Sequence, residues 1–263
     1  MRLPLNIDSA MASAVWYRNL VLYKRTWKMN ILPNFFEPLL YLLGMGFGLG
    51  AYLGEDVGGV SYIAYIAPGL LAASAMNGAV FEGTYNVYLK MHMGRIYDAF
   101  LGTRAQVEDI AFGELLWATT RAGIYGGGYL VIVATLSALG MDLITSPWAL
   151  LLPLVIALTG LLFGSIALWF TSRISSIDLF SYFFALFYMP LFLFSGIFFP
   201  VEQFPGGEVI AWFLPLFHAV RTARAFAHGV VDWTHAASLL WMLVASGVAF
   251  AMVPRQLRKK LTR

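Results

Sequence analysis

Six apolar segments of about 20 residues each constrain the fold of this chain more than any other feature. They lie at 34–53, 62–83, 115–139, 148–170, 179–198 and 236–253. A helix needs about 20 mainly apolar residues to cross the ~30 Å hydrocarbon core of a membrane. Only 12% of the 263 residues are charged, against roughly 25% in a soluble domain. The sequence therefore predicts an all-α integral membrane protein, one domain over 1–263, with six membrane-spanning helices.

Residues 9–30 carry the pattern of a helix that lies on the membrane surface. Large apolar side chains recur at i, i+4, i+7 and i+11, on one narrow helical face: Trp16, Leu20, Tyr23 and Trp27. The opposite side is basic: Arg18, Lys24, Arg25 and Lys28. An apolar face opposite a basic face is typical of an amphipathic interfacial helix.

The basic residues are distributed unequally between the two sides of the membrane. Fourteen of the 17 lysines and arginines lie before the first span, in the loops after spans two and four, or in the C-terminal tail. The loops 54–61 and 140–147 contain none. Because cytoplasmic loops carry an excess of lysine and arginine, we expect both termini in the cytoplasm.

The stretch 194–226, before the last span, fits neither a membrane span nor a polar loop. Three prolines divide it, since proline cannot continue a helix interior: Pro200, Pro205 and Pro215. The pattern predicts two short helices, about 206–214 and 216–227, each too short to cross. Irregular backbone persists at membrane depth only where it is buried in protein or lines a cavity.

We therefore expect a re-entrant helical hairpin at 199–227, on the extracytoplasmic side. The alternative is an amphipathic loop that lies on the surface. The residues assigned to the hairpin are Phe198, Phe199, Pro200, Pro205, Pro215, His218 and Arg221.

The cytoplasmic loop 88–109 contains a second short helical pattern. A two-turn helix over 95–101 would expose Ile96, Tyr97 and Phe100 to the cytoplasm. Apolar residues exposed among charges suggest a docking surface for a soluble partner. A short interfacial helix with its apolar face in the lipid headgroups is the alternative, and the residues alone leave both open.

A few ionisable residues lie at or near membrane depth. Glu37 enters span one, Glu82 leaves span two, and Glu114 and Arg121 are seven residues apart on span three. Isolated charges are costly in lipid, so they pair or face water. We expect Arg121 to reach Glu82 or Glu114 in an ion pair that joins two helices. The alternative is a substrate contact.

No motif in the chain indicates catalysis. The phosphate-binding GxxxxGK[ST] loop, HExxH and GxSxG are absent, and the four histidines are scattered. The chain has no cysteine, which excludes disulfides, thiolate metal sites and cysteine nucleophiles. We therefore expect no catalytic residue, cofactor or metal on this chain.

These parts, in this order, resemble the membrane subunits of type-2 ABC exporters. The hairpin motif FSGIFFPVEQFP…PLFHAVR, at 194–205 and 215–221, carries the broad likeness. Three segments resemble the nodulation-type lipo-oligosaccharide permeases, which are related to daunorubicin-resistance-type exporters: EPLLYLLGMGFGLG (37–50), PGLLAASAMNGAVFEGTY (68–85) and GELLWATTRA (113–122). The likeness covers essentially the whole chain.

The resemblance implies a homodimer in a bacterial cytoplasmic membrane, in contact with lipid and not nucleic acid, with two copies of a separate ATP-binding subunit that holds ATP and Mg. It assigns ATPase coupling to Arg95, Ile96, Tyr97, Asp98, Ala99, Phe100, Leu101 and Gly102. It assigns the gate helix to Trp16, Arg18, Leu20, Tyr23, Arg25 and Trp27. The pathway would follow the dimer interface along spans one, two and five, with the hairpin closing its outer end.

The predicted function is a transport subunit, not an enzyme, that exports a lipo-oligosaccharide, glycolipid or lipid-linked saccharide. Efflux of a drug or antibiotic is the alternative within the same family. An integral membrane enzyme acting on lipid-linked substrates would need clustered carboxylates or histidines, and only Glu82, Asp109 and Glu114 are loosely grouped. A structural or assembly protein would not explain the hairpin.

Overall fold

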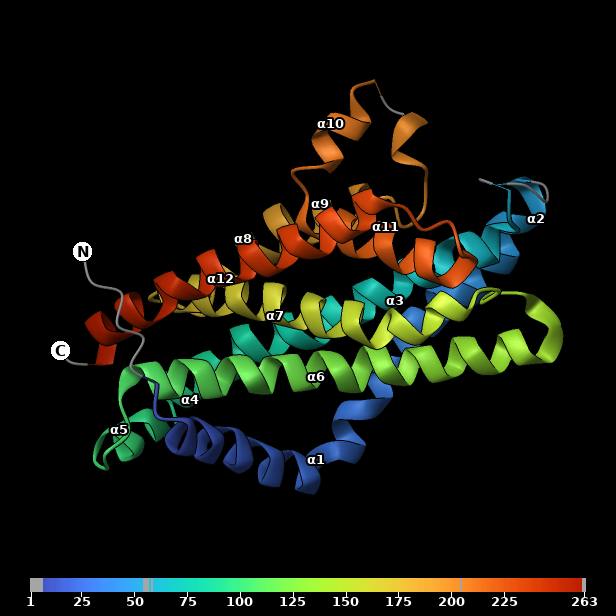
Figure 1. Cartoon of the computed structure of the whole chain (residues 1–263). Helices are drawn as coiled ribbons and strands as arrows, with labels where there is room; N and C mark the ends of the chain where they lie inside the picture. The colour runs from blue at the N-terminus through green and yellow to red at the C-terminus, as the bar shows by residue number, and fades with distance from the viewer. Residues whose placement is uncertain (1–6, 54–56, 58, 204, 262–263) are drawn as a thin grey trace.

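A computed structural model describes residues 7–53, 57, 59–203 and 205–261 of the chain. The regular elements of this part are helices arranged as an elongated bundle (Figure 1). Val57 and Val60 form an isolated antiparallel bridge.

The longer helical runs alternate with short turns. In chain order the elements are α1 (Ser9–Leu43), η1 (Gly44–Leu49), α2 (Gly50–Leu53), α3 (Tyr62–Phe81), η2 (Glu82–Asn86), α4 (Val87–His92), α5 (Ile96–Leu101), α6 (Val107–Leu136), η3 (Ser137–Met141), η4 (Pro147–Leu151), α7 (Leu152–Thr171), α8 (Leu179–Phe183), η5 (Phe184–Tyr188), α9 (Met189–Phe194), η6 (Val201–Gln203), α10 (Gly207–Ala211), α11 (Pro215–His228) and α12 (Trp233–Leu261). The wide π turns are η1, η2, η3 and η5, whereas η4 and η6 are 3₁₀ turns.

Within the described residues, 4 helical runs are long and apolar enough to cross a membrane. They are Tyr62–His92, Val107–Met141, Pro147–Thr171 and Trp233–Leu261. The run Leu179–Phe194 is apolar but shorter. It ends four residues before the predicted limit of span five, because the backbone turns at Gly196 with φ of +80°.

The predicted interfacial helix 9–30 and first span 34–53 are not separate elements. The chain is helical without a break from Ser9 to Leu53, through α1, η1 and α2. Figure 1 shows that α1 bends partway along its length. Pro33 and Pro38 fall in its second half, and proline is a common cause of helix kinks.

The last span was predicted to end at residue 253, directly before Pro254, but the helix does not end there. The helix α12 continues through it to Leu261. Proline removes one backbone hydrogen bond, and neighbouring structure can satisfy the freed carbonyl. The basic tail therefore extends the helix as far as the structure describes it.

The helix α3 forms the centre of the bundle. It packs against α1, α6, α7 and α11, and its residues from Ala64 to Val80 are all buried. Small residues allow this close packing in a membrane protein. A Cβ atom added at Gly78 would lie 2.4 Å from Tyr125 Cδ2 and 2.7 Å from the Arg121 carbonyl oxygen on α6.

The two ends of the bundle are tied by different contacts. At the end that carries α5, the Asp8 amide donates to Asp109 Oδ1 at 2.7 Å, and Arg258 donates to Glu108 at 2.5 Å. The start of α1 and the last turns of α12 therefore lie together at this end (Figure 1). At the other end, the Thr145 amide donates to the Ala227 carbonyl oxygen at 2.9 Å.

The two short helices of the predicted hairpin region are α10 and α11. The helix α10 projects from the bundle in Figure 1. The helix α11 instead packs against α3, α7 and α12. Most of its side chains are buried, so α11 is part of the bundle.

We expect Gly78→Ala to destabilise the protein, because the added methyl group meets backbone atoms of α6 that cannot rotate away. Overpacking of this kind costs about 1–3 kcal/mol. The matched control is Gly123→Ala on α6, where a Cβ atom meets nothing within 4 Å. Thermal unfolding in detergent checks both variants, and equal melting temperatures would contradict the close approach of α3 and α6.

Candidate functional site

A cluster of buried charges lies where η2, α4 and α6 meet. Lys90 Nζ is 2.9 Å from Glu82 Oε1 and 2.7 Å from Glu114 Oε2. The exposed fractions are 9% for Lys90, 3% for Glu82 and 2% for Glu114. Removing one member of such a pair leaves an uncompensated buried charge, which is strongly unfavourable.

Arg121 adds a second cation to the cluster. Its Nε atom lies 3.5 Å from Glu82 Oε2. Its guanidinium carbon lies 4.5 Å from the ring centre of Tyr23 and 4.7 Å from that of Tyr125. The aromatic faces attract the cation, so Arg121 connects α6 to α1 as well as to η2.

The cluster also holds α5 and α1. The Tyr97 hydroxyl donates to Glu114 Oε1 at 3.1 Å, and Asn19 Nδ2 donates to Glu114 Oε2 at 3.0 Å. Burial, and then the nearby Glu114 carboxylate, raise the pKa of Tyr97 well above its usual value. Tyr97 therefore remains a protonated donor.

The sequence predicted that the Tyr97 side chain faces the cytoplasm, and this prediction is wrong. Its side chain is 1% exposed. Pattern analysis treated all three apolar residues of the short helix alike. The hydroxyl of Tyr97, unlike the side chains of Ile96 and Phe100, reaches a buried carboxylate.

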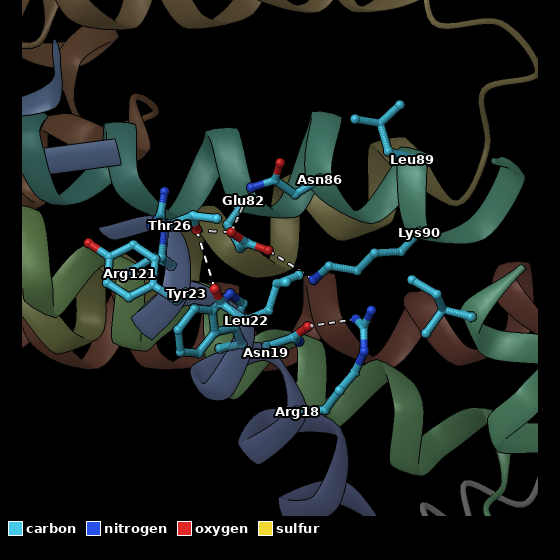
Figure 2. Close-up of a pocket in the computed structure, with 12 residues that line it drawn as sticks. Arg18, Asn19, Leu22, Tyr23, Thr26, Glu82, Asn86, Leu89, Lys90 and Arg121 are labelled. Atoms are coloured by element: carbon cyan, nitrogen blue, oxygen red, sulfur yellow. Dashed lines mark hydrogen bonds and ion pairs between the residues drawn. The ribbon is translucent and has the colours of Figure 1, made fainter. Parts of the chain in front are cut away.

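A pocket of about 340 Å³ opens beside the cluster. Figure 2 shows Glu82, Lys90 and Arg121 directed toward one another across it, with Asn19 and Tyr23 of α1 at its edge. The helix α1 supplies the largest share of the lining, η2, α4 and α6 supply most of the rest, and Ile96 brings in α5. The pocket thus lies between the elements that the resemblance calls the gate helix and the coupling helix.

The local sequence explains how one helical run positions two members of the cluster. Glu82, Asn86 and Lys90 follow at intervals of four residues, so they lie near one face of the run η2–α4. Asn86 Nδ2 donates to Glu82 Oε2 at 2.7 Å. The long side chain of Lys90 spans the eight residues back to Glu82 and also reaches α6.

Lys90 and Asn19 are the residues that sequence reasoning missed. Lys90 was counted as a charge of the cytoplasmic loop, but the helix of span two continues to His92. The four-residue spacing of Glu82, Asn86 and Lys90 is the signal that would have found it. Asn19 lies on the α1 face that contacts α6, next to Ala12 and Val15. It is polar, so it did not belong to the stripe of large apolar residues predicted for this helix.

The other residues assigned to coupling surround Tyr97 on α5. Asp98, Ala99 and Gly102 are exposed, as is Arg95, which precedes α5 with left-handed backbone (φ of 43°). The side chains of Ile96, Phe100 and Leu101 are half-buried. They pack at the edge of an apolar cluster that includes Val107 and Ile110. The outer face of α5 is therefore small and polar.

The residues assigned to the gate helix do not share one environment. Trp16 Nε1 donates to Thr120 Oγ1 at 2.9 Å, and the Tyr23 ring meets the Trp117 ring edge-on at 5.7 Å. Arg18 and Leu20 are half-buried, whereas Arg25 and Trp27 are exposed. In the predicted apolar stripe, Trp16 and Tyr23 therefore contact α6, whereas Trp27 is exposed.

The residues assigned to the hairpin are also divided. Phe198 is buried, with its ring 5.3 Å from that of Phe192. His218 is buried on α11, where Nε2 donates to the Trp212 carbonyl oxygen at 3.0 Å and Nδ1 lies 3.2 Å from Ser238 Oγ. Burial lowers the pKa of His218, which favours the neutral ring.

The remaining members of this group lie nearer the surface. Phe199 and Pro205 are exposed, Pro200 and Arg221 are half-buried, and Pro215 is the first residue of α11. The Arg221 guanidinium lies 5.3 Å from the centre of the Trp212 ring.

Arg224 is the stronger anchor of this region, and the sequence analysis did not single it out. Its Nη2 donates to the Gly196 carbonyl oxygen at 2.7 Å, and its Nε donates to the Tyr65 carbonyl oxygen at 3.2 Å. Its guanidinium also lies 3.7 Å from the centre of the Tyr65 ring. One arginine therefore joins α11, α3 and the turn after α9.

Comparisons with known proteins give a consistent result. The sequence model of the family described as "ABC-2 type transporter" matches residues 12–226. "Nodulation protein J" of Rhizobium leguminosarum bv. trifolii is 39% identical over 254 residues, which are 95% of this chain and 94% of that protein. The protein of the same name from Neorhizobium galegae is 36% identical, over 93% of each chain. That from Rhizobium meliloti (strain 1021) is 39% identical, over 82% of this chain and 80% of the relative.

We expect Lys90→Met to lower the free energy of unfolding by roughly 3–5 kcal/mol, because two buried carboxylates would lose their shared cation. Lys24→Met, at an exposed position of α1, is the control and should have little effect. The double variant Lys90→Met/Glu114→Gln should recover part of the loss. Denaturant unfolding in detergent measures all three, and equal stability of the two lysine variants would refute a buried ion pair.

Proposed function

Because the chain belongs to the ABC-2 type transporter family, we propose that it is the permease of an ATP-driven exporter for an amphipathic saccharide-containing molecule. The chain is a multi-pass protein of the bacterial cytoplasmic membrane and a transport subunit. We further propose that the chain crosses the membrane six times, that both termini lie in the cytoplasm, and that the pathway runs between two copies of the chain. In this proposal, 199–227 forms a re-entrant hairpin.

The observation that carries the proposal is the attachment of α5 to the buried charges. The hydrogen bond from Tyr97 to Glu114 joins α5 to a cluster that also includes residues of η2, α4 and α6. A force applied to α5 from the cytoplasm would therefore act on the long helices directly. A short helix resting in lipid headgroups, the alternative for this loop, has no need of such a link.

In the proposed mechanism, the permease works with two copies of a separate ATPase subunit, and each copy binds ATP and Mg. The ATPase subunits would bind the exposed face of α5, with the first turns of α1 beside it. ATP-driven closure would push α5 and α1 together, since both contact Glu114. The displacement would pass to α4 and α6 through Lys90 and separate the two permease copies.

The proposed substrate class is inferred from the proteins that this chain resembles. The nodulation-type resemblance implies a lipo-oligosaccharide, and the curated relatives are named "Nodulation protein J". Drug or antibiotic efflux remains the second candidate within the family. A membrane enzyme is disfavoured because Glu82 and Glu114, two of the three carboxylates it would use, both bind Lys90.

We expect Phe100→Glu to abolish stimulation of the partner ATPase by the permease, because the new charge removes the packing of half-buried Phe100 that holds α5 in its docking position. Ala99→Arg, at an exposed position of the same helix, should do the same without touching the core. Ser175→Glu, exposed in the turn between α7 and α8, is the control on the same predicted side. Normal stimulation in both α5 variants would place the docking surface elsewhere.

Native mass spectrometry of the protein extracted gently from its host membrane tests the assembly. We expect a species with two 29.1 kDa permease chains and two copies of a soluble ATPase. A monomer or a bare dimer that persists after crosslinking in the intact membrane would contradict the exporter proposal.

A further inference from the structure

Glu37 is an exposed carboxylate in the part of α1 that the sequence assigns to the first span. Within the described part of the chain, no lysine or arginine forms an ion pair with it. A carboxylate at membrane depth is costly unless it pairs or faces water, and it marks a functional site by default.

Two polar side chains from other helices stand behind Glu37. Asn77 on α3 lies with its Nδ2 3.4 Å from Glu37 Oε2. The Tyr188 hydroxyl, at the end of η5, donates to Asn77 Oδ1 at 3.1 Å. Because the amide oxygen of Asn77 accepts from Tyr188, its nitrogen faces the carboxylate. This arrangement orients Glu37 through Oε2, and among the residues that the structure describes its other oxygen, Oε1, accepts no hydrogen bond.

An apolar groove of about 570 Å³ adjoins this carboxylate. It is lined by Phe36, Glu37, Leu40, Tyr41, Gly44 and Met45. All six residues belong to α1 and the first two positions of η1, so the groove is an open, mainly apolar strip along one helical run. Ligand sites combine mainly apolar walls with a few placed polar groups, and here the polar group is Glu37.

We propose that Glu37 binds the saccharide head of the exported amphiphile by accepting hydrogen bonds from its hydroxyl groups, with the acyl chain along the apolar groove. This inference rests on the proposed function and names a contact within it. A carboxylate only accepts hydrogen bonds, and a sugar ring offers adjacent hydroxyl donors without a net charge. The Tyr41 ring packs against the rings of Phe192 and Phe198 and is half-buried, and the part that remains on the groove wall would contact the sugar ring. Asn77 and Tyr188 are positioning residues.

Binding to the full-length permease in lipid nanodiscs tests this inference without the ATPase. The probe is N-dodecanoyl-glucosamine, compared with N-dodecanoyl-ethanolamine, which lacks the sugar ring, and with dodecyltrimethylammonium. We expect the wild type to bind the glycolipid at least about tenfold more tightly than the ethanolamide. A charge-assisted hydrogen bond is strong enough to account for this factor.

We expect Glu37→Gln to reduce glycolipid affinity about tenfold and to leave ethanolamide affinity unchanged. Tyr188→Phe should reduce glycolipid affinity by a smaller factor, about threefold, at an unchanged melting temperature, because it acts through Asn77. The control is Glu208→Gln, which removes an exposed carboxylate on α10 and should change neither affinity.

Four outcomes would overturn the inference: no binding of the glycolipid, equal affinity for glycolipid and ethanolamide, unchanged glycolipid affinity in Glu37→Gln, or a preference for the ammonium probe that this variant removes. Loss of a permease dimer in Glu37→Gln would also overturn it and assign the groove to a second copy. None of these results bears on the ATPase assembly, which the mass measurement tests separately.

Discussion

The contact of Lys90 with two buried carboxylates is the interaction on which the arrangement of the helices around α5 depends. Each member is almost fully removed from solvent, so none of the three can separate without leaving an uncompensated charge. Asn19, Tyr97 and Arg121 then attach α1, α5 and α6 to the same carboxylates. The segments η2–α4, α5 and α6, together with the distant α1, are thereby held in one geometry by electrostatics as well as by apolar packing.

A second anchor operates at the opposite end of the bundle. Arg224 donates to two carbonyl oxygens, one on α3 and one in the turn after α9. His228 Nε2 on the same helix lies 3.1 Å from the Ala64 carbonyl oxygen. These hydrogen bonds hold α11 against α3 at backbone positions, and the Tyr65 ring of α3 adds a cation–π contact with Arg224. Between the two anchors, α3 packs through small residues such as Gly78.

Most of the long helices could be predicted from hydropathy and charge, because their length and apolar composition are local properties of the sequence. Three predictions made from the same properties were wrong. Pro254 lies inside a helix because its surroundings tolerate one missing hydrogen bond. Lys90 is buried because two carboxylates, one of them on α6, offset its charge. Tyr97 is buried because its hydroxyl meets Glu114. Each depends on a contact with another part of the fold, which hydropathy and charge placement alone do not contain.

The π turn η2 separates the buried face of α3 from Lys90 on α4. A π turn contains one residue more than a regular turn, and one residue corresponds to a rotation of about 100°. If η2 tightened into regular helix, α4 would swivel by that angle relative to α3 while its backbone hydrogen bonds re-formed. Lys90 would then leave Glu82, and α5 would follow. The extra residue of η2 therefore sets the angle at which Lys90 meets Glu82 and Glu114.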